Sequence, residues 1–92
     1  MRRAAKVDII QPAIVDTLRQ VGATVQVLSA VGEGCPDILC GWHGENLLME
    51  IKDKTGELTP KQLIWHKGWT GQKAIVRSRN DAIDVLNNAV KK

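Results

Sequence analysis

The sequence predicts a single α/β domain in which a mixed sheet of about four strands is flanked by helices. Apolar residues with helical spacing come first, two short apolar runs then form a hairpin pattern, and a helix and a further strand follow. A hairpin is antiparallel, whereas a strand reached through a crossover helix can pair in parallel, so the sheet is predicted to be mixed. The predicted order is α-β-β-β-α-β-α. A length of 92 residues, without repeats or a long linker, is typical of one domain.

The first helix is predicted over residues 7–20, with Gly22 beyond its end. Its apolar stripe consists of Ile10, Ile14, Leu18 and Val21. Pro12 falls inside this range and lacks the N–H that a helix interior needs. We therefore expect the regular helix to begin near Pro12, with Asp8 in or before the first turn.

The strands are predicted from short apolar or β-branched runs. They cover residues 24–29, 37–41, 46–52 and 73–77. The second and third are joined by residues 42–45, which is the pattern of a β-hairpin. The loop before the hairpin, residues 31–36, contains Gly32 and Gly34. These glycines permit either a tight turn or a close approach of the backbone to a phosphate, and the sequence does not decide between the two.

Two further helices are marked by capping patterns. They are predicted from residue 59 to about 68 and over residues 79–90. Thr59 and Gln62 have the spacing of a capping box, and Pro60 suits the first helical turn. Ser78 and Asp81 have the same spacing at the start of the last helix.

The charge balance favours a polyanionic partner such as nucleic acid. The formal net charge is +3 and the isoelectric point is about 9.1. Part of the excess lies near the ends of the chain, where charge often serves only to keep a protein in solution: Arg2, Arg3, Lys6, Lys91 and Lys92. The chain has three tryptophans but no Phe or Tyr. This composition argues against a single-strand binder that stacks base after base on aromatic rings.

The sequence predicts neither a membrane protein nor a secreted one. No apolar run approaches the roughly 20 residues of a membrane helix. The N-terminal residues do not have the pattern of a signal peptide, because polar residues interrupt the stretch after the basic start. Cys35 and Cys40 are therefore expected to be free thiols in a cytoplasmic protein.

Three charged residues are the candidates for chemistry. Glu50 and Lys52 lie two residues apart on a predicted strand, so their side chains project to the same face. The strand is otherwise apolar, and two charges on it are costly unless they are paired, hydrated or bound to metal. The hairpin brings Asp37 back beside this strand. Two carboxylates and an ammonium group are thus predicted to converge at one end of the sheet.

This set suits metal-dependent hydrolysis of a phosphodiester. Asp37 and Glu50, with a backbone carbonyl such as that of Ile51, offer the hard oxygen ligands that Mg²⁺ or Mn²⁺ prefers. Such a metal lowers the pKa of a bound water and neutralises charge on the phosphate. Lys52 is expected to hold the attacking water or to stabilise the charge of the transition state.

The same residues resemble a known family. Pro36-Asp37, followed after twelve residues by Glu50-Ile51-Lys52, is similar to the signature of the PD-(D/E)xK nucleases. A longer pattern resembles the virus-type replication–repair nuclease (VRR-NUC) family and covers nearly the whole chain. It consists of Gly34-Cys35-Pro36-Asp37-Ile38-Leu39, Leu48-Met49-Glu50-Ile51-Lys52, Leu58-Thr59-Pro60-Lys61-Gln62 and Gln62-x-x-Trp65-His66. A bare PD…ExK motif is weak; the longer strings in this order of elements are specific.

The resemblance implies a restriction-endonuclease-like core and a divalent-metal-dependent nuclease. Small phage members of the family are associated with cleavage of branched DNA, including four-way (Holliday) junctions, as homodimers. The family also tends to place an acidic residue on the first helix beside the metal. Asp8 fits that position best, although Glu is the usual residue there and the shorter side chain puts its reach in doubt. Gln11, Gln62 and His66 resemble further polar positions that could place the substrate.

Each candidate also has an ordinary structural explanation. Asp37 could be a turn residue after proline, and Glu50 with Lys52 could be a solvent-facing strand pair. For Gln62, a helix cap explains the residue as well as substrate positioning does. We expect His66 to be a partly exposed helix residue. Asp8 is equally suited to the helix dipole and to a metal.

Three remaining expectations concern aromatic residues, cysteines and assembly. Trp65 and Trp69, four apart on a helix, are expected to be core anchors rather than DNA contacts. A zinc site is disfavoured, because the Cys35-x₄-Cys40 spacing is not that of a zinc knuckle. A homodimer is expected, because a small core gains from association and two-fold symmetry matches a symmetric branched substrate.

Two other functions remain open at this point. The chain could be a junction-binding module, or a nuclease subunit that needs a partner in order to cut. The carboxylates argue against a pure binder, since they repel DNA unless metal neutralises them. A zinc-stabilised structural domain is the other alternative, and it would unfold when a chelator removes the metal.

Overall fold

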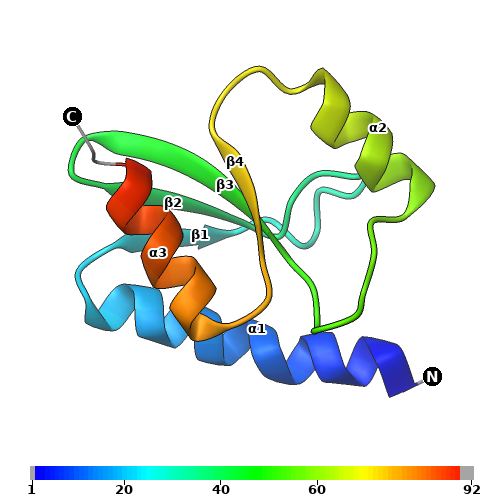
Figure 1. Ribbon diagram of the computed structural model, residues 1–92, viewed down its shortest axis with the longest axis horizontal. Coiled ribbons are helices and arrows are strands. Elements are labelled where there is room, and N and C mark those ends of the chain that lie inside the picture. Colours follow the sequence, from blue (N-terminus) through cyan, green and yellow to red (C-terminus); the bar gives the residue numbers. More distant parts are fainter. Residues whose placement is uncertain (1, 90–92) are drawn as a thin grey trace.

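The structure, a computed structural model, contains three helices and four strands among its described residues (Figure 1). It describes the backbone of residues 2–89 and the side chains of residues 9–89. In chain order the elements are α1 (Arg2–Gln20), β1 (Thr24–Val27), β2 (Ile38–Trp42), β3 (Glu45–Ile51), α2 (Pro60–Gly68), β4 (Lys73–Val76) and α3 (Arg79–Ala89). This is the predicted order α-β-β-β-α-β-α.

The four strands form one mixed sheet, as predicted, and lie in the order β1-β2-β3-β4. β1, β2 and β3 pair antiparallel, whereas β4 pairs parallel to β3 after the crossover through α2. The hairpin between β2 and β3 is tighter than predicted, because Trp42 pairs with Glu45 and only two residues turn. Both turn residues, His43 and Gly44, have positive φ angles of 48° and 82°, the conformation that right-twisted hairpins favour.

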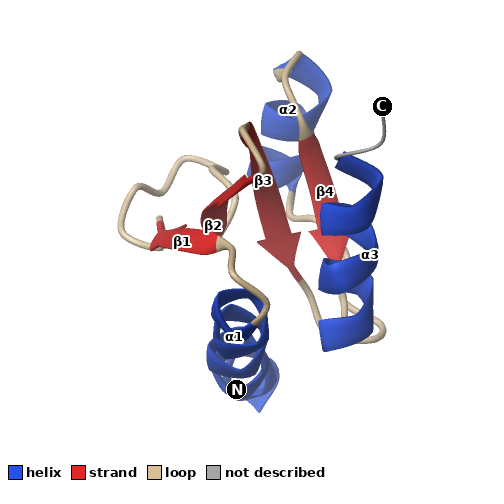
Figure 2. Ribbon diagram, turned by 90° about the vertical axis from the view of Figure 1, so that its left-hand side faces the viewer, coloured by secondary structure: helices blue, strands red, loops and turns tan. Residues whose placement is uncertain are grey.

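The hydrophobic core lies between one face of the sheet and the helices α1 and α3. Successive strand residues point to opposite faces, so Met49 and Ile51 of β3 face this core whereas Glu50 faces away from it. The fully buried core side chains include Ile14 and Leu18 of α1, Ile38 and Cys40 of β2, and Leu86 of α3. Figure 2 shows α2 at the end of the sheet remote from α1. No residue of α2 belongs to the core.

Two predicted boundaries differ from the structure by two residues or more. α1 runs through Pro12 from Arg2 instead of beginning near the proline. The Pro12 ring is exposed, so it costs a backbone hydrogen bond but displaces no core side chain. β1 ends at Val27, two residues early, because a turn closed by a hydrogen bond from Val31 N to Leu28 O begins there. Within the described residues, no helix is long and apolar enough to cross a membrane.

Candidate active site

Asp37 directly precedes β2 and is fixed to β3 by two hydrogen bonds. Its backbone N–H donates to the carbonyl of Met49 at 3.1 Å, and its carboxylate Oδ2 accepts the N–H of Ile51 at 2.6 Å. The β2–β3 register pairs Ile38 with Met49, so its continuation places Asp37 opposite Glu50. Directly opposed residues of an antiparallel pair project to the same face. The structure therefore brings the two predicted carboxylates together.

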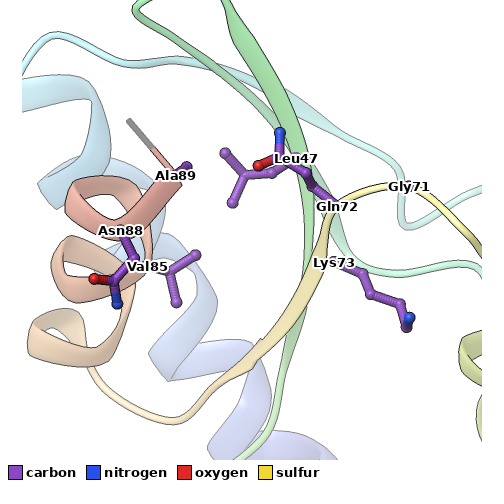
Figure 3. A pocket seen from close by; sticks show the side chains of 7 residues that line it. All are labelled: Leu47, Gly71, Gln72, Lys73, Val85, Asn88 and Ala89. Carbon is purple, nitrogen blue, oxygen red and sulfur yellow. The ribbon is translucent and has the colours of Figure 1, made fainter. Parts of the chain in front are cut away.

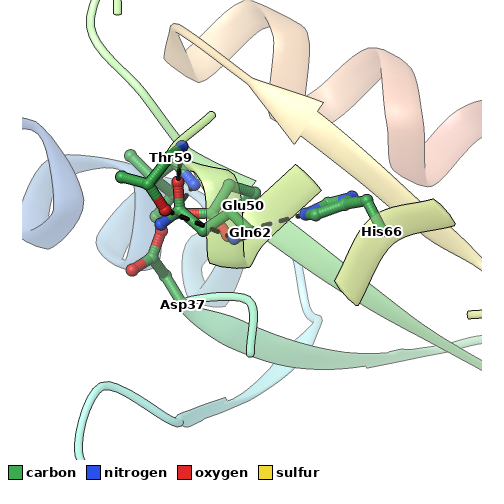
Figure 4. Close-up of polar contacts among 6 residues, drawn as sticks. Asp37, Glu50, Thr59, Gln62 and His66 are labelled. Atoms are coloured by element: carbon green, nitrogen blue, oxygen red, sulfur yellow. Dashed lines mark hydrogen bonds and ion pairs between the residues drawn. The ribbon is translucent and has the colours of Figure 1, made fainter. Parts of the chain in front are cut away.

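Glu50 is buried within the sheet, with 1% of its surface exposed. Its Oε2 accepts a hydrogen bond from Gln62 Nε2 at 3.1 Å (Figure 4). Its Oε1 has no hydrogen-bond partner and lies 3.6 Å from His66 Nε2, which is also buried without a partner. Gln62 and His66 are four residues apart, so one side of α2 faces both oxygens of this carboxylate.

The environment of Glu50 opposes its ionisation. Burial is the largest cause, and the neighbouring Asp37 carboxylate adds to it, so that the pKa of Glu50 rises to about 8. Lys52 acts in the opposite direction. A buried carboxylate with an unpartnered oxygen, beside a second carboxylate, is an arrangement that a cation would relieve.

Gln62 forms the predicted helix cap and also contacts Glu50, while its role in substrate positioning stays a prediction. The backbone N–H of Gln62 donates to Thr59 Oγ1 at 3.2 Å, and Thr59 N donates to Gln62 Oε1 at 2.9 Å, which completes the predicted capping box. The amide nitrogen remains available for Glu50. Because an amide has both an acceptor and a donor, a cap and a site contact do not exclude each other.

The expectation of a partly exposed His66 is wrong, since only 7% of the residue is exposed. Burial, and then the charges of Lys73 and Lys52, lower the pKa of the imidazole. The neutral form is thus favoured beside Glu50. The spacing of Gln62 and His66 on one helix face was the available signal, but the sequence did not reveal that this face turns inward.

Lys52 and Ile51 lie just where β3 ends. The half-buried Lys52 donates its backbone N–H to the carbonyl of Val76, and its charge acts on both Glu50 and His66. The N–H and C=O groups of one strand residue point to the same side of the strand. Because the N–H of Ile51 points to Asp37, its carbonyl lies on the Asp37 side as well.

Gly34 is a positioning residue whose role the sequence left undecided. A Cβ atom added at this residue would lie 2.5 Å from the backbone oxygen of Lys61, and the φ angle of Gly34 is +82°. The loop before Asp37 therefore packs directly against the first turn of α2, which carries Gln62. Gly32, with a φ of +74°, has no atom within 4 Å of such a Cβ, so it serves the turn.

Of the two candidates on α1, only the side chain of Gln11 lies within the described residues. Gln11 Nε2 donates to Ser29 Oγ at 3.3 Å, and the structure gives it no contact with Asp37 or Glu50. Asp8 falls within α1, but its side chain lies outside the described residues.

The tryptophans of α2 are not core anchors, contrary to expectation. Trp65 and Trp69 stack on each other with ring centroids 4.7 Å apart and planes 16° apart. Trp69 is 42% exposed, and neither ring belongs to the core. The predicted i, i+4 pairing is present, but α2 presents these rings away from the core.

Both cysteines are free thiols. Cys40 is buried on the core side, where burial raises its pKa to about 11. Cys35 is half-buried, and burial with the charges of Glu50 and Asp37 raises its pKa. Among the described side chains, no three of His, Cys, Asp and Glu cluster with the spacing that holds a metal. A metal at Asp37 and Glu50 would thus need backbone or water ligands as well.

A hollow of about 340 Å³ lies elsewhere, between the end of α3 and the start of β4 (Figure 3). Its lining contains one charged residue, Lys73, beside Leu47, Gly71, Gln72, Val85, Asn88 and Ala89. The lining residues include no carboxylate and no nucleophile.

Comparison with known proteins identifies the fold. No protein-family model and no curated protein matches the sequence. A solved structure described as "VRR_NUC domain" superposes with a TM-score of 0.73 at 24% sequence identity, covering 89% of this chain and 95% of that one. The chain has the restriction-endonuclease-like fold of that domain, which is the fold that the resemblance implied.

Proposed function

We propose that this chain is a VRR-NUC-type endonuclease that hydrolyses DNA phosphodiester bonds with the help of a divalent metal, Mg²⁺ or Mn²⁺. The observation that carries the proposal is the convergence of Asp37 and Glu50 on one face of the sheet, with Lys52 beside them. The VRR_NUC-like fold supports a nuclease-type domain.

The residues present fit a hard divalent cation. Both carboxylates supply oxygen ligands, and Glu50 Oε1 is buried without a partner. The Ile51 carbonyl lies on the Asp37 side and can complete a set of three protein oxygens. Asp8 remains a candidate for a further ligand from α1. A bound cation would supply charge neutralisation at the phosphate and activation of a water.

The other residues of the site act on charge and geometry. Lys52, with its ammonium near Glu50, holds the attacking water or stabilises the negative charge that develops on the phosphate. Gln62 orients the Glu50 carboxylate through its 3.1 Å hydrogen bond, and His66 faces the second oxygen. This makes both residues positioning groups for Glu50. Gln11 has no such contact and is not part of the proposed machinery.

Branched DNA, with the four-way junction as the test case, is the proposed substrate. The net positive charge suits a polyanion, and a homodimer would present two active sites to a symmetric junction. The free thiols suit a cytoplasmic protein, in a bacterium or a phage-infected cell where replication and repair produce such junctions.

The test is cleavage of a labelled four-way junction and its matching linear duplex in Mg²⁺ and in Mn²⁺. Wild type is compared with Asp37→Ala. The matched control is Asp84→Ala, which changes an exposed residue of α3. We expect cutting by wild type and by the control, abolished by EDTA and by Asp37→Ala. Binding without cutting in either metal would contradict the proposal and favour a binding module or a subunit that needs a partner.

A further inference from the structure

Several apolar side chains on α2 and just after it are exposed, and no described element covers them. Ile64 is 72% exposed, Leu63 47% and Trp69 42%. With Trp65, which stacks on Trp69, these residues form what we call the α2 ridge. Exposed apolar residues that gather on one short helix mark an interaction surface more often than scattered ones do.

The α2 ridge lies in a strongly cationic part of the chain. Between residues 58 and 80 there is no Asp or Glu. Lys61 and Lys67 lie on α2, and Lys73 Nζ donates to the backbone oxygen of Trp69 at 3.1 Å. Lys61 contacts Glu33 at 3.8 Å, but this ion pair is exposed and therefore weak. The charge of the surface is complementary to phosphate.

We propose that the α2 ridge binds unstacked bases of DNA at a branch point, a gap or an end, while the surrounding lysines hold the adjacent phosphates. In a regular duplex the base faces are stacked on one another. The duplex therefore offers phosphates to the lysines but no free base face to the ridge. Bases that have lost a stacking neighbour expose a flat apolar face that tryptophan and aliphatic side chains can cover. The inference rests on the proposed function in one respect, namely that DNA is the substrate.

Within the ridge, Ile64 lies on the side of the helix opposite the carboxylates. Gln62 and His66 face Glu50, whereas Ile64 points to solvent.

A single stacked pair of rings also agrees with the composition. The chain has three tryptophans and no Phe or Tyr, which is too few aromatic rings for a long stacking track. Trp65 and Trp69 instead provide one platform, sized for one or two bases.

The experiment measures binding in EDTA, so that no cleavage occurs. The probes are a four-way junction, a gapped duplex and a continuous duplex of the same length. Ile64→Ala is compared with Ile9→Ala on α1, because the two isoleucines are equally exposed at 72%. Trp69→Ala is compared with Trp69→Phe, which keeps a ring.

We expect Ile64→Ala and Trp69→Ala to weaken junction and gap binding about fivefold to a hundredfold, with duplex affinity unchanged within about twofold. Ile9→Ala and Trp69→Phe should bind like wild type. Equal losses on all three probes, or no loss on any, would overturn the inference. So would light scattering that shows Ile64→Ala separating a dimer into monomers with unchanged DNA affinity, since the ridge would then bind a second copy.

The inference and the nuclease proposal can fail separately. If wild type binds with this selectivity but never cuts in Mg²⁺ or Mn²⁺, the inference about base binding is supported and the nuclease proposal is contradicted. If wild type cuts and the two ridge variants bind normally, only the inference is overturned. A wild type that binds none of the probes overturns the inference together with the choice of DNA as substrate.

Discussion

The two faces of the sheet are made by the same strands but are covered in different ways. On one face, α1 and α3 bury a continuous set of aliphatic side chains, with Met49 and Ile51 of β3 almost wholly enclosed. On the other face, α2 covers the buried Glu50 and His66 and leaves Ile64 in solvent. The difference shows that one residue step along β3 separates the part that stabilises the fold from the part arranged for chemistry.

This contrast has an energetic side. Apolar burial against α1 and α3 is favourable, whereas an unpartnered carboxylate oxygen in the interior is unfavourable. Specific polar and backbone contacts therefore hold α2 in place. They are the capping box at Thr59, the close approach of Gly34 to Lys61, and the hydrogen bond between Gln62 and Glu50.

The largest expected effect is on the core face. Met49→Ala leaves a cavity between the sheet and the helices, and it should lower the free energy of unfolding by about 2–5 kcal/mol. Leu63→Ala on α2 should change it by less than about 0.5 kcal/mol, because that side chain is 47% exposed. Urea denaturation measures both. Equal losses for the two variants would show that α2 shares the core after all.

On the chemical face, Lys52→Ala should lower the cleavage rate about 100-fold to 1,000-fold, because it removes the charge that stabilises the transition state. Lys54→Ala, two residues along in the exposed turn, is the matched control and should cut like wild type. The measurement is the single-turnover cleavage rate of each variant on the four-way junction. Comparable rates for the two variants would remove Lys52 from the proposed machinery.

Glu50 should make metal-free stability depend on pH. The folded-state pKa of about 8 exceeds the ordinary value of 4.5, so the folded protein binds more protons than the unfolded one between these pH values. Its stability should fall as pH rises through this window and should level off above it. Glu50→Gln should abolish this dependence and be more stable than wild type at pH 9 by about 1–3 kcal/mol.

The comparison of Glu50→Gln with wild type is made by thermal denaturation at several pH values, with and without Mg²⁺. Added Mg²⁺ should raise the melting temperature of wild type at pH 9 but not that of the variant. A wild type more stable than Glu50→Gln at pH 9 without metal would show that the buried carboxylate is compensated by a partner.

The smallest expected effects separate the two functions of Gln62. Thr59→Ala removes the helix cap and should cost about 1 kcal/mol of stability, with Mn²⁺ affinity unchanged. Gln62→Met also removes the hydrogen bond to Glu50, and it should weaken Mn²⁺ binding about tenfold or more. Calorimetric titration of Mn²⁺ measures the affinities. Equal Mn²⁺ affinity in both variants would reduce Gln62 to a cap.

Some features of the molecule follow from local sequence patterns. The order of elements, the mixed sheet, the capping box at Thr59 and Gln62, and the juxtaposition of Asp37 with Glu50 were all predicted. They depend on interactions between residues close in sequence, or on the two-residue period of a strand in a hairpin. Such rules act within a few residues and can be applied without knowing the rest of the fold.

Other features were decided only when distant segments packed together. Two expectations were wrong for this reason: His66 is buried and Trp69 is outside the core. A helix of nine residues carries too little periodic pattern to say which side faces the sheet. That orientation is set by contacts far apart in sequence, such as Gly34 against Lys61, and by the buried Glu50 that α2 covers. The sequence by itself thus determined which residues are the candidates for chemistry, and the tertiary structure decided which side of α2 meets them and which side is left in solvent.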